Sequence, residues 1–217
     1  MANKRQYCAI IGDINKSRGL PARGRVQKKF QKSIDSINRE FRPQIASRFK
    51  LTLGDEFQGL LKSPAQSYRL VRRFQDLMGI VPFAFGIGIG PLATPVIPKE
   101  ALGMDGECFY RAREALKLAK KKKQEVVYDF PGPALKLVNV LISSLEKQWK
   151  SLNPTDQRIV QLSKEDLTQK DMAKELGITQ QAISKVYRSK VIREMVDADG
   201  AIYEFFSTYS VSRTTTK

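Results

Sequence analysis

The chain has 217 residues, 41% of them hydrophobic, and carries 38 basic and 22 acidic side chains with no histidine, for a net charge of +16. This length and apolar content can bury the core of one large or two small domains, so disorder throughout is not expected. The lack of imidazole excludes Ser/His/Asp and Cys/His nucleophile systems and the usual zinc sites, and neither zinc nor haem is an expected cofactor.

Cysteine usage and hydropathy indicate the compartment. Cys8 and Cys108 are too few for a disulfide framework and lie in apolar sequence, which indicates reduced core thiols. The apolar run at residues 7–11 is too short for a signal-peptide core, and no stretch approaches the roughly 20 apolar residues of a membrane helix. We therefore expect a cytoplasmic protein with no membrane partner.

Strands and helices alternate in the first part of the chain. Hydrophobic periodicity predicts strands at 6–12, 48–53, 57–61, 83–90 and 125–129, with helices from about 21 to 42, 64 to 78 and 106 to 123. In 83–90, glycines alternate with larger apolar residues, so one face is smooth and a helix or ligand should approach it closely. This order predicts an α+β domain of ferredoxin-like type over residues 1–132.

The tract Phe130-Pro131-Gly132-Pro133 is typical of a domain boundary, and residues 133–217 are predicted to be all-α. Asn153-Pro154 has the cap and first-turn proline of a helix start. The segment 198–209 is unusually aromatic, which suits either core packing or a dimer contact. Since paired half-sites are the usual way for a weak DNA-binding module to gain affinity, a homodimer is expected.

The most specific pattern is LTQKDMAKELGITQQAISKVYRSK, residues 167–190. It resembles a helix-turn-helix, with the small Ala173 where two helices touch and Gly177 in the turn. The second helix of such modules enters the major groove. The side chains expected to contact DNA are Thr179, Gln180, Gln181, Ser184, Lys185 and Arg188. The alternative is a helical hairpin that packs on a partner without DNA.

The basic surplus is not in this segment. Residues 1–132 hold 25 basic and 12 acidic side chains, a net of +13, which leaves +3 for residues 133–217. An excess of this size favours a polyanionic partner for the first domain.

Two acidic positions stand out in the first domain. Asp13 follows the first strand, and Asp55 and Glu56 occupy the hairpin tip. If these strands are neighbours, the acids emerge at one edge of the sheet, an arrangement that binds Mg²⁺ or Mn²⁺ and nucleotide phosphates. The alternative is a Gly-Asp turn beside a solvated loop. Basic side chains that would contact the ligand follow the first acid: Lys16, Arg18, Arg23 and Arg25.

The segments IIGDI, LTLGDEFQGLL, FGIGIG and DGECFYRAREALK resemble successive motifs of the nucleotide cyclase superfamily, which includes class III and GGDEF cyclases. Together with the C-terminal pattern, the chain is similar to the SatD-like family of small bacterial proteins. The cyclase resemblance spans residues 6 to about 130. It implies a ferredoxin-like nucleotide-cyclase-type domain in which Asp13 and Asp55 bind metal, Glu56 matches the end of GGDEF, and Arg113 stabilises phosphate.

Departures from the cyclase pattern are also clear. Leu53 replaces a glycine of GGDEF, Leu51 a base-reading lysine, and Phe109 a catalytic asparagine. The resemblance therefore implies a nucleotide with Mg or Mn that is bound without cyclisation. We expect a DNA-binding transcriptional regulator that senses this ligand. The alternatives are a metal-dependent nucleotidyl- or phosphoryl-transfer enzyme, and an RNA-binding or assembly module.

Overall fold

The computed structural model describes residues 5–15, 23–52, 55–163, 167–188 and 190–209. Contacts divide the chain into two compact units, residues 1–139 with 203–217, and residues 140–202. The predicted domains, residues 1–132 and 133–217, remain a prediction. The compact units differ from these ranges in two respects: the first unit extends to residue 139, and the end of the last helix belongs to it.

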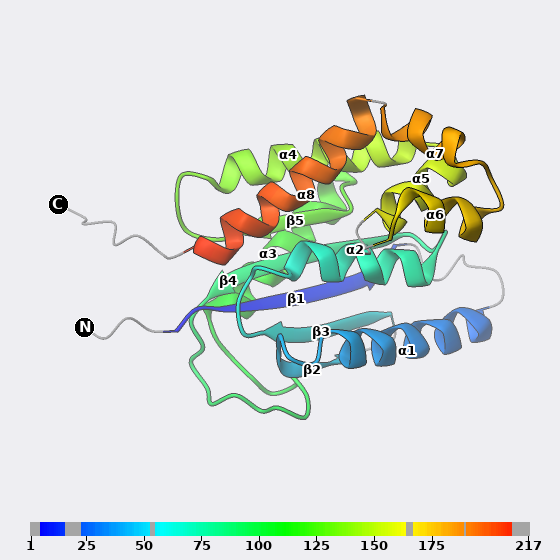
Figure 1. The fold of residues 1–217 in the computed structure, drawn as a ribbon. Coiled ribbons are helices and arrows are strands. Elements are labelled where there is room, and N and C mark those ends of the chain that lie inside the picture. Colours follow the sequence, from blue (N-terminus) through cyan, green and yellow to red (C-terminus); the bar gives the residue numbers. More distant parts are fainter. Residues whose placement is uncertain (1–4, 16–22, 53–54, 164–166, 189, 210–217) are drawn as a thin grey trace. The chain divides into compact units, whose positions relative to one another are not determined.

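A mixed sheet organises the first unit. In the described residues its elements are β1 (Tyr7–Ile14), α1 (Arg23–Glu40), β2 (Ile45–Leu51), β3 (Glu56–Leu61), α2 (Ser67–Met78), β4 (Phe83–Gly90), α3 (Glu107–Lys122) and β5 (Val126–Asp129). The strand order is β2-β3-β1-β4-β5 (Figure 1). The four strands from β2 to β4 pair antiparallel, and β5 adds parallel to β4. The βαββαβ order confirms the predicted α+β, ferredoxin-like class for this part of the chain.

One face of the sheet packs against α1 and α2 through aromatic rings. Phe30 of α1 meets Phe57 and Phe83 edge-on, with ring centroids 5.6 and 5.3 Å apart. Phe74 of α2 stacks on Phe57 at 4.6 Å. A Cβ at Gly12 would lie 2.2 Å from the Phe57 ring, so the ring fills the place of a side chain there.

The opposite face packs against α3 at backbone distance. A Cβ on Gly86 would lie 2.1 Å from the carbonyl oxygen of Ala112, and one on Gly88 would lie 2.1 Å from that of Cys108. The smooth face predicted for residues 83–90 is therefore occupied by a helix. Cys8 and Cys108 are free and buried, as predicted, and burial raises the pKa of both thiols, that of Cys108 to about 12.

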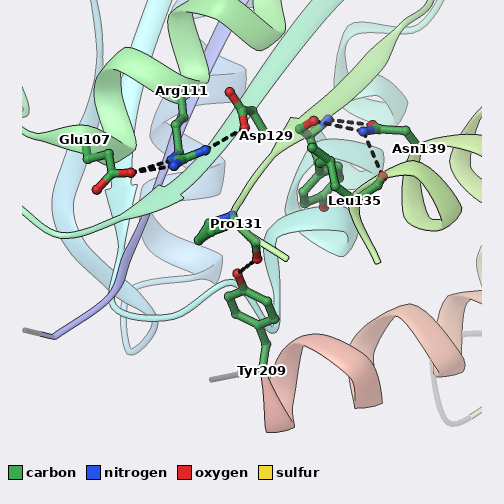
Figure 2. A network of polar contacts seen from close by, with 8 residues as sticks. Glu107, Arg111, Asp129, Pro131, Leu135, Asn139 and Tyr209 are labelled. Atoms are coloured by element: carbon green, nitrogen blue, oxygen red, sulfur yellow. Dashed lines mark hydrogen bonds and ion pairs between the residues drawn. The ribbon is translucent and has the colours of Figure 1, made fainter. Parts of the chain in front are cut away.

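Each edge strand of the sheet is capped by an asparagine from a neighbouring helix. On β2, the Asn38 amide donates to the Phe49 carbonyl at 2.9 Å and accepts from the Phe49 N–H at 2.8 Å. On β5, Asn139 makes the same pair of bonds with Tyr128, at 2.9 and 2.8 Å (Figure 2). These side chains satisfy backbone groups that an edge strand otherwise leaves without a partner strand.

The end of α8 (Lys190–Thr208) returns to β5. Phe206 is buried and stacks on Tyr128, with ring centroids 5.0 Å apart. The Tyr209 hydroxyl donates to the Pro131 carbonyl at 2.6 Å (Figure 2). Nearby, Arg111 joins Asp129 to Glu107. Of the two roles suggested for the aromatic segment, core packing is the one that Phe206 fulfils.

The second unit is helical in its described residues. It takes the greater part of α4 (Leu135–Ser151), then α5 (Pro154–Leu162), α6 (Gln169–Leu176), α7 (Gln180–Tyr187) and the first part of α8. The Asn153 side chain accepts from the Asp156 N–H, as the Asn-Pro signal predicted. Its core contains Ile159, Leu162, Met172, Ala173 and Ile183. Among the described residues, no helix combines the length and hydropathy needed to cross a bilayer.

Candidate functional site

Two acids of the first unit face each other across neighbouring strands. Asp13 near the end of β1 is paired in register with Glu56 at the start of β3. Side chains alternate along a strand, and Ala9 and Ile11 of β1 pack against α3, so Asp13 lies on that same face. Both carboxylates are largely covered, with 18% and 19% of their side chains exposed. The sequence-based expectation that the Asp13 strand and the hairpin would be neighbours is confirmed.

Two cations of α3 pair with these acids. The guanidinium of Arg113 donates to both carboxylate oxygens of Glu56, with 2.9 Å between Nη2 and Oε1. The ammonium of Lys120 pairs with Oδ2 of Asp13. Thr52 adds a hydroxyl bond to Glu56 Oε1 at 3.2 Å. The acids and cations thus form one compact ionic network at the end of the sheet.

The electrostatics link the two pairs. Hydrogen bonding to Glu56 raises the pKa of Arg113, and the charges of Glu56 and Asp13 raise it further against the opposing effect of burial. Arg113 therefore responds to both acids, although it hydrogen-bonds only Glu56 among the described residues. A ligand that changes the charge at Asp13 would therefore also change the pKa of Arg113.

Other residues predicted for this site are placed differently. Asp55 is half-buried, and its carbonyl accepts from the Ile14 N–H at 3.1 Å. Arg25 is exposed on α1, and no described hydrogen bond or ion pair joins it to the acids. Lys16, Arg18 and the Arg23 side chain lie outside the described residues, as does Leu53.

Lys120 was not among the predicted site residues, because cations at the C-terminal end of a helix are usually solvated and favoured by the helix dipole. Its spacing carried the missing signal. Lys120 follows Arg113 by seven residues, two helical turns, so both project from one face of α3. Once Arg113 is assigned to phosphate, the same face predicts Lys120 as its neighbour.

A divalent cation fits this site only in part. Carboxylate oxygens are the ligands that Mg²⁺ and Mn²⁺ prefer, and Asp13 and Glu56 supply them from adjacent strands. Within the described residues, however, no three metal-ligating side chains converge. Both carboxylates are also paired with cations. A metal at Asp13 would therefore replace the Lys120 ammonium.

A second candidate site lies on α6, α7 and the turn between them. The Thr168 hydroxyl accepts from the Asp171 N–H at 3.2 Å, and the Asp171 carboxylate accepts from the Thr168 N–H, which forms a capping box. Hydrogen bonding from Thr168 lowers the pKa of Asp171. Gly177 ends α6 at φ +64°, where a side chain would be strained, and Thr179 caps α7.

The two sides of α7 differ in burial. Ile183 is fully buried, and Val186 packs against the same core. The predicted DNA-contacting side chains occupy the other side; all are exposed except the half-buried Ser184: Thr179, Gln180, Gln181, Ser184, Lys185 and Arg188. Neither Lys185 nor Arg188 has an ion-pair partner in the part of the chain that the structure describes. As far as the structure describes the chain, α7 therefore presents donors and cations without internal counter-charges.

The chain is therefore a two-unit protein. One unit is built on a βαββαβ sheet with paired acids at one end, and the other unit is helical. The SatD family model matches residues 7–198, and the chain belongs to the SatD family. A comparison with curated proteins gave no match.

The solved structures that match this chain share little sequence with it. A bacterial light-regulated adenylyl cyclase is 12% identical with a TM-score of 0.42, over 57% of this chain and 74% of that one. An EAL/GGDEF domain protein from M. capsulatus is 15% identical with a TM-score of 0.40, over 60% and 88%. A Csm1-Csm4 cassette in complex with one ATP is 14% identical with a TM-score of 0.38; 91% of this chain matches, but only 37% of that chain. Similarity at this level does not extend to a shared activity.

Proposed function

We propose that this SatD family protein is a DNA-binding transcriptional regulator that reads DNA through α7 and senses a nucleotide or another phosphate-bearing ligand near Asp13 and Glu56. The observation that carries the proposal is the sidedness of α7. Its inner side is fixed by Ile183, and its outer side carries two glutamines and two cations. Glutamine can pair bidentately with adenine, and Lys or Arg can pair with guanine or phosphate.

The turn geometry supports a helix-turn-helix. Ala173 is small and nearly buried on α6, and Gly177 adopts the left-handed conformation that a tight turn between helices requires. The residues at the start of α7 would then meet base edges. One such module makes few base contacts, so we propose that the protein acts as a homodimer on paired half-sites.

The DNA-binding proposal predicts salt-sensitive binding of the full chain to selected genomic fragments. Lys185→Ala and Gln181→Ala should each weaken specific binding about 10-fold, because each removes one contact worth roughly 1–3 kcal/mol. Lys147→Ala is the matched control, since Lys147 is exposed on α4. Fluorescence anisotropy with labelled fragments is the measurement. Wild-type protein that binds no fragment at low salt would contradict the proposal, and binding of RNA alone would favour the RNA-binding alternative.

The facing acids favour a second candidate function, metal-dependent nucleotidyl or phosphoryl transfer. Asp13 and Glu56 would hold Mg²⁺ or Mn²⁺, and Arg113 would neutralise phosphate charge. A bound metal would supply Lewis-acid polarisation of a phosphoryl oxygen. This chain's own contribution would be the placement of Arg113, which Glu56 orients through both of its carboxylate oxygens. Turnover of ATP or GTP with Mn²⁺, lost in Asp13→Asn, would support this function.

The ionic network predicts how metal affinity responds to substitution. Lys120→Ala should raise the affinity for Mn²⁺ about 10-fold, because it removes the cation that competes for Asp13. Asp13→Asn should abolish the binding. Lys117→Ala is the control on the same helix, because Lys117 pairs instead with Glu114. Free Mn²⁺ measured by electron paramagnetic resonance gives the affinities. Equal binding by the wild type and the three variants would contradict a metal site at Asp13.

A further inference from the structure

A cavity of about 680 Å³ lies beside the edge strand β2, between the second half of α1 and the segment around Pro98. It is distinct from the acidic site. Ile45 in its lining pairs with Leu61 at the end of β3, whereas Glu56 begins that strand. Five residue steps of about 3.3 Å therefore put roughly 16 Å of strand between the two positions.

Three arginines line the cavity. Arg39 comes from α1, Arg42 from the turn that follows it, and Arg48 from β2, and all three are exposed. Arg39 donates to the Ser36 hydroxyl at 3.1 Å. The guanidiniums of Arg42 and Arg48 have no hydrogen-bonding or ionic partner in the part of the chain that the structure describes.

Little negative charge within the lining offsets these cations. Among the described residues that line the cavity, Asp35 is the acidic one. Its carboxylate already accepts from the Gln31 amide at 3.1 Å. Three guanidiniums gathered around one concavity repel one another unless an anion enters it. The cavity is therefore a site of positive potential, shaped to hold more than a single water-sized group.

Hydrogen bonds fix the walls of the cavity before any ligand arrives. Asn38 of the lining bonds both backbone groups of Phe49. The Ser47 hydroxyl donates to the Ile97 carbonyl at 2.6 Å, and the Arg48 N–H donates to the Pro98 carbonyl at 3.1 Å. Because β2 is tied on both sides, binding a ligand costs little ordering of the backbone.

We propose that this cavity binds a nucleoside di- or triphosphate. The planar fork of a guanidinium matches phosphate oxygens, and three such groups suit a chain of adjacent phosphates. Ile45, Ala46 and Pro98 give the cavity an apolar wall for a sugar or base. Its volume lies in the range of small-molecule sites, about 300–1,000 Å³. Since the lining offers cations rather than paired carboxylates, binding here needs no divalent metal.

Calorimetric titration of the full chain with ATP in excess EDTA tests this site. We expect a dissociation constant below about 1 mM for the wild type and a loss of at least about 10-fold in both Arg42→Gln and Arg48→Gln. Lys28→Gln, which removes an exposed α1 cation outside the lining, should bind as the wild type does. Excess EDTA removes the divalent metal that the acidic site would bind, which separates binding in this cavity from binding at the acidic site.

Four results would overturn the proposal. The first is no ATP binding by the wild type, and the second is equal binding by the arginine variants and the wild type. The third is that the arginine variants lose binding to duplex DNA but keep their ATP binding. This result would show that these arginines contact a nucleic-acid backbone. Pyrophosphate serves as the remaining probe. Weaker binding of pyrophosphate than of ATP supports the nucleoside class, and equal binding overturns it.

Discussion

Gly88→Ala is expected to destabilise the first unit by about 3 kcal/mol or more, which is the upper part of the range for overpacking. The added methyl would lie 2.1 Å from the Cys108 carbonyl oxygen and 2.2 Å from the Ala112 nitrogen. Both atoms belong to the backbone of α3, so no side chain can rotate to make room. The helix must move away from β4, and contacts along its buried face are lost together.

Urea unfolding followed by circular dichroism measures this effect. Gly24→Ala is the matched control, because a Cβ at Gly24 in α1 meets no atom within 4 Å. Alanine favours a helix over glycine by up to about 1 kcal/mol, so the control should be neutral or slightly stabilised. If Gly88→Ala unfolds at the same urea concentration as the control, α3 does not pack on β4 at backbone distance.

The alternating glycines of β4 show how much of the packing on this strand the sequence could predict. The pattern of Gly86 and Gly88 correctly predicted a strand with one smooth face, since alternation is a local property of the chain. It could not distinguish a helix from a ligand as the occupant, because the helix that packs there begins at Glu107. That choice depends on the three-dimensional path of the chain.

The acidic site shows the same division between local and long-range information. A carboxylate at a strand end and another at a hairpin tip are visible in sequence, and their meeting follows if the strands pair. The partner of Asp13 is 107 residues away, on α3. Only the sheet order, with α3 packed over β4 and β1, brings Lys120 to Asp13.

The last helix extends beyond the aromatic segment 198–209 that stood out in the sequence, because α8 begins at Lys190. Ile192 and Met195 continue the buried stripe that Ile202 and Phe206 complete. Charged residues between them hid this continuity in the sequence, because a helix with one buried side accepts charges on its others.

Asn38→Leu is expected to destabilise the first unit by about 2–4 kcal/mol. Leucine has the branched outline of asparagine, although it is larger, and it bonds neither backbone group of Phe49, which lies buried on the edge strand β2. Each buried polar group left without a partner costs about 1–3 kcal/mol. The same reasoning applies to Asn139→Leu, which would leave both backbone groups of Tyr128 without their side-chain partner on β5.

The two substitutions should add in a double variant, because they act on opposite edges of the sheet. Gln31→Leu is the control for Asn38→Leu, since Gln31 is exposed on the same helix and, among the described residues, its side chain bonds only Asp35. It should change the free energy of unfolding by less than about 0.5 kcal/mol. Edge strands without caps also offer their backbone to other chains. We therefore expect the double variant to associate at concentrations where the wild type and the control do not, and light scattering that shows no such difference would refute a capping role.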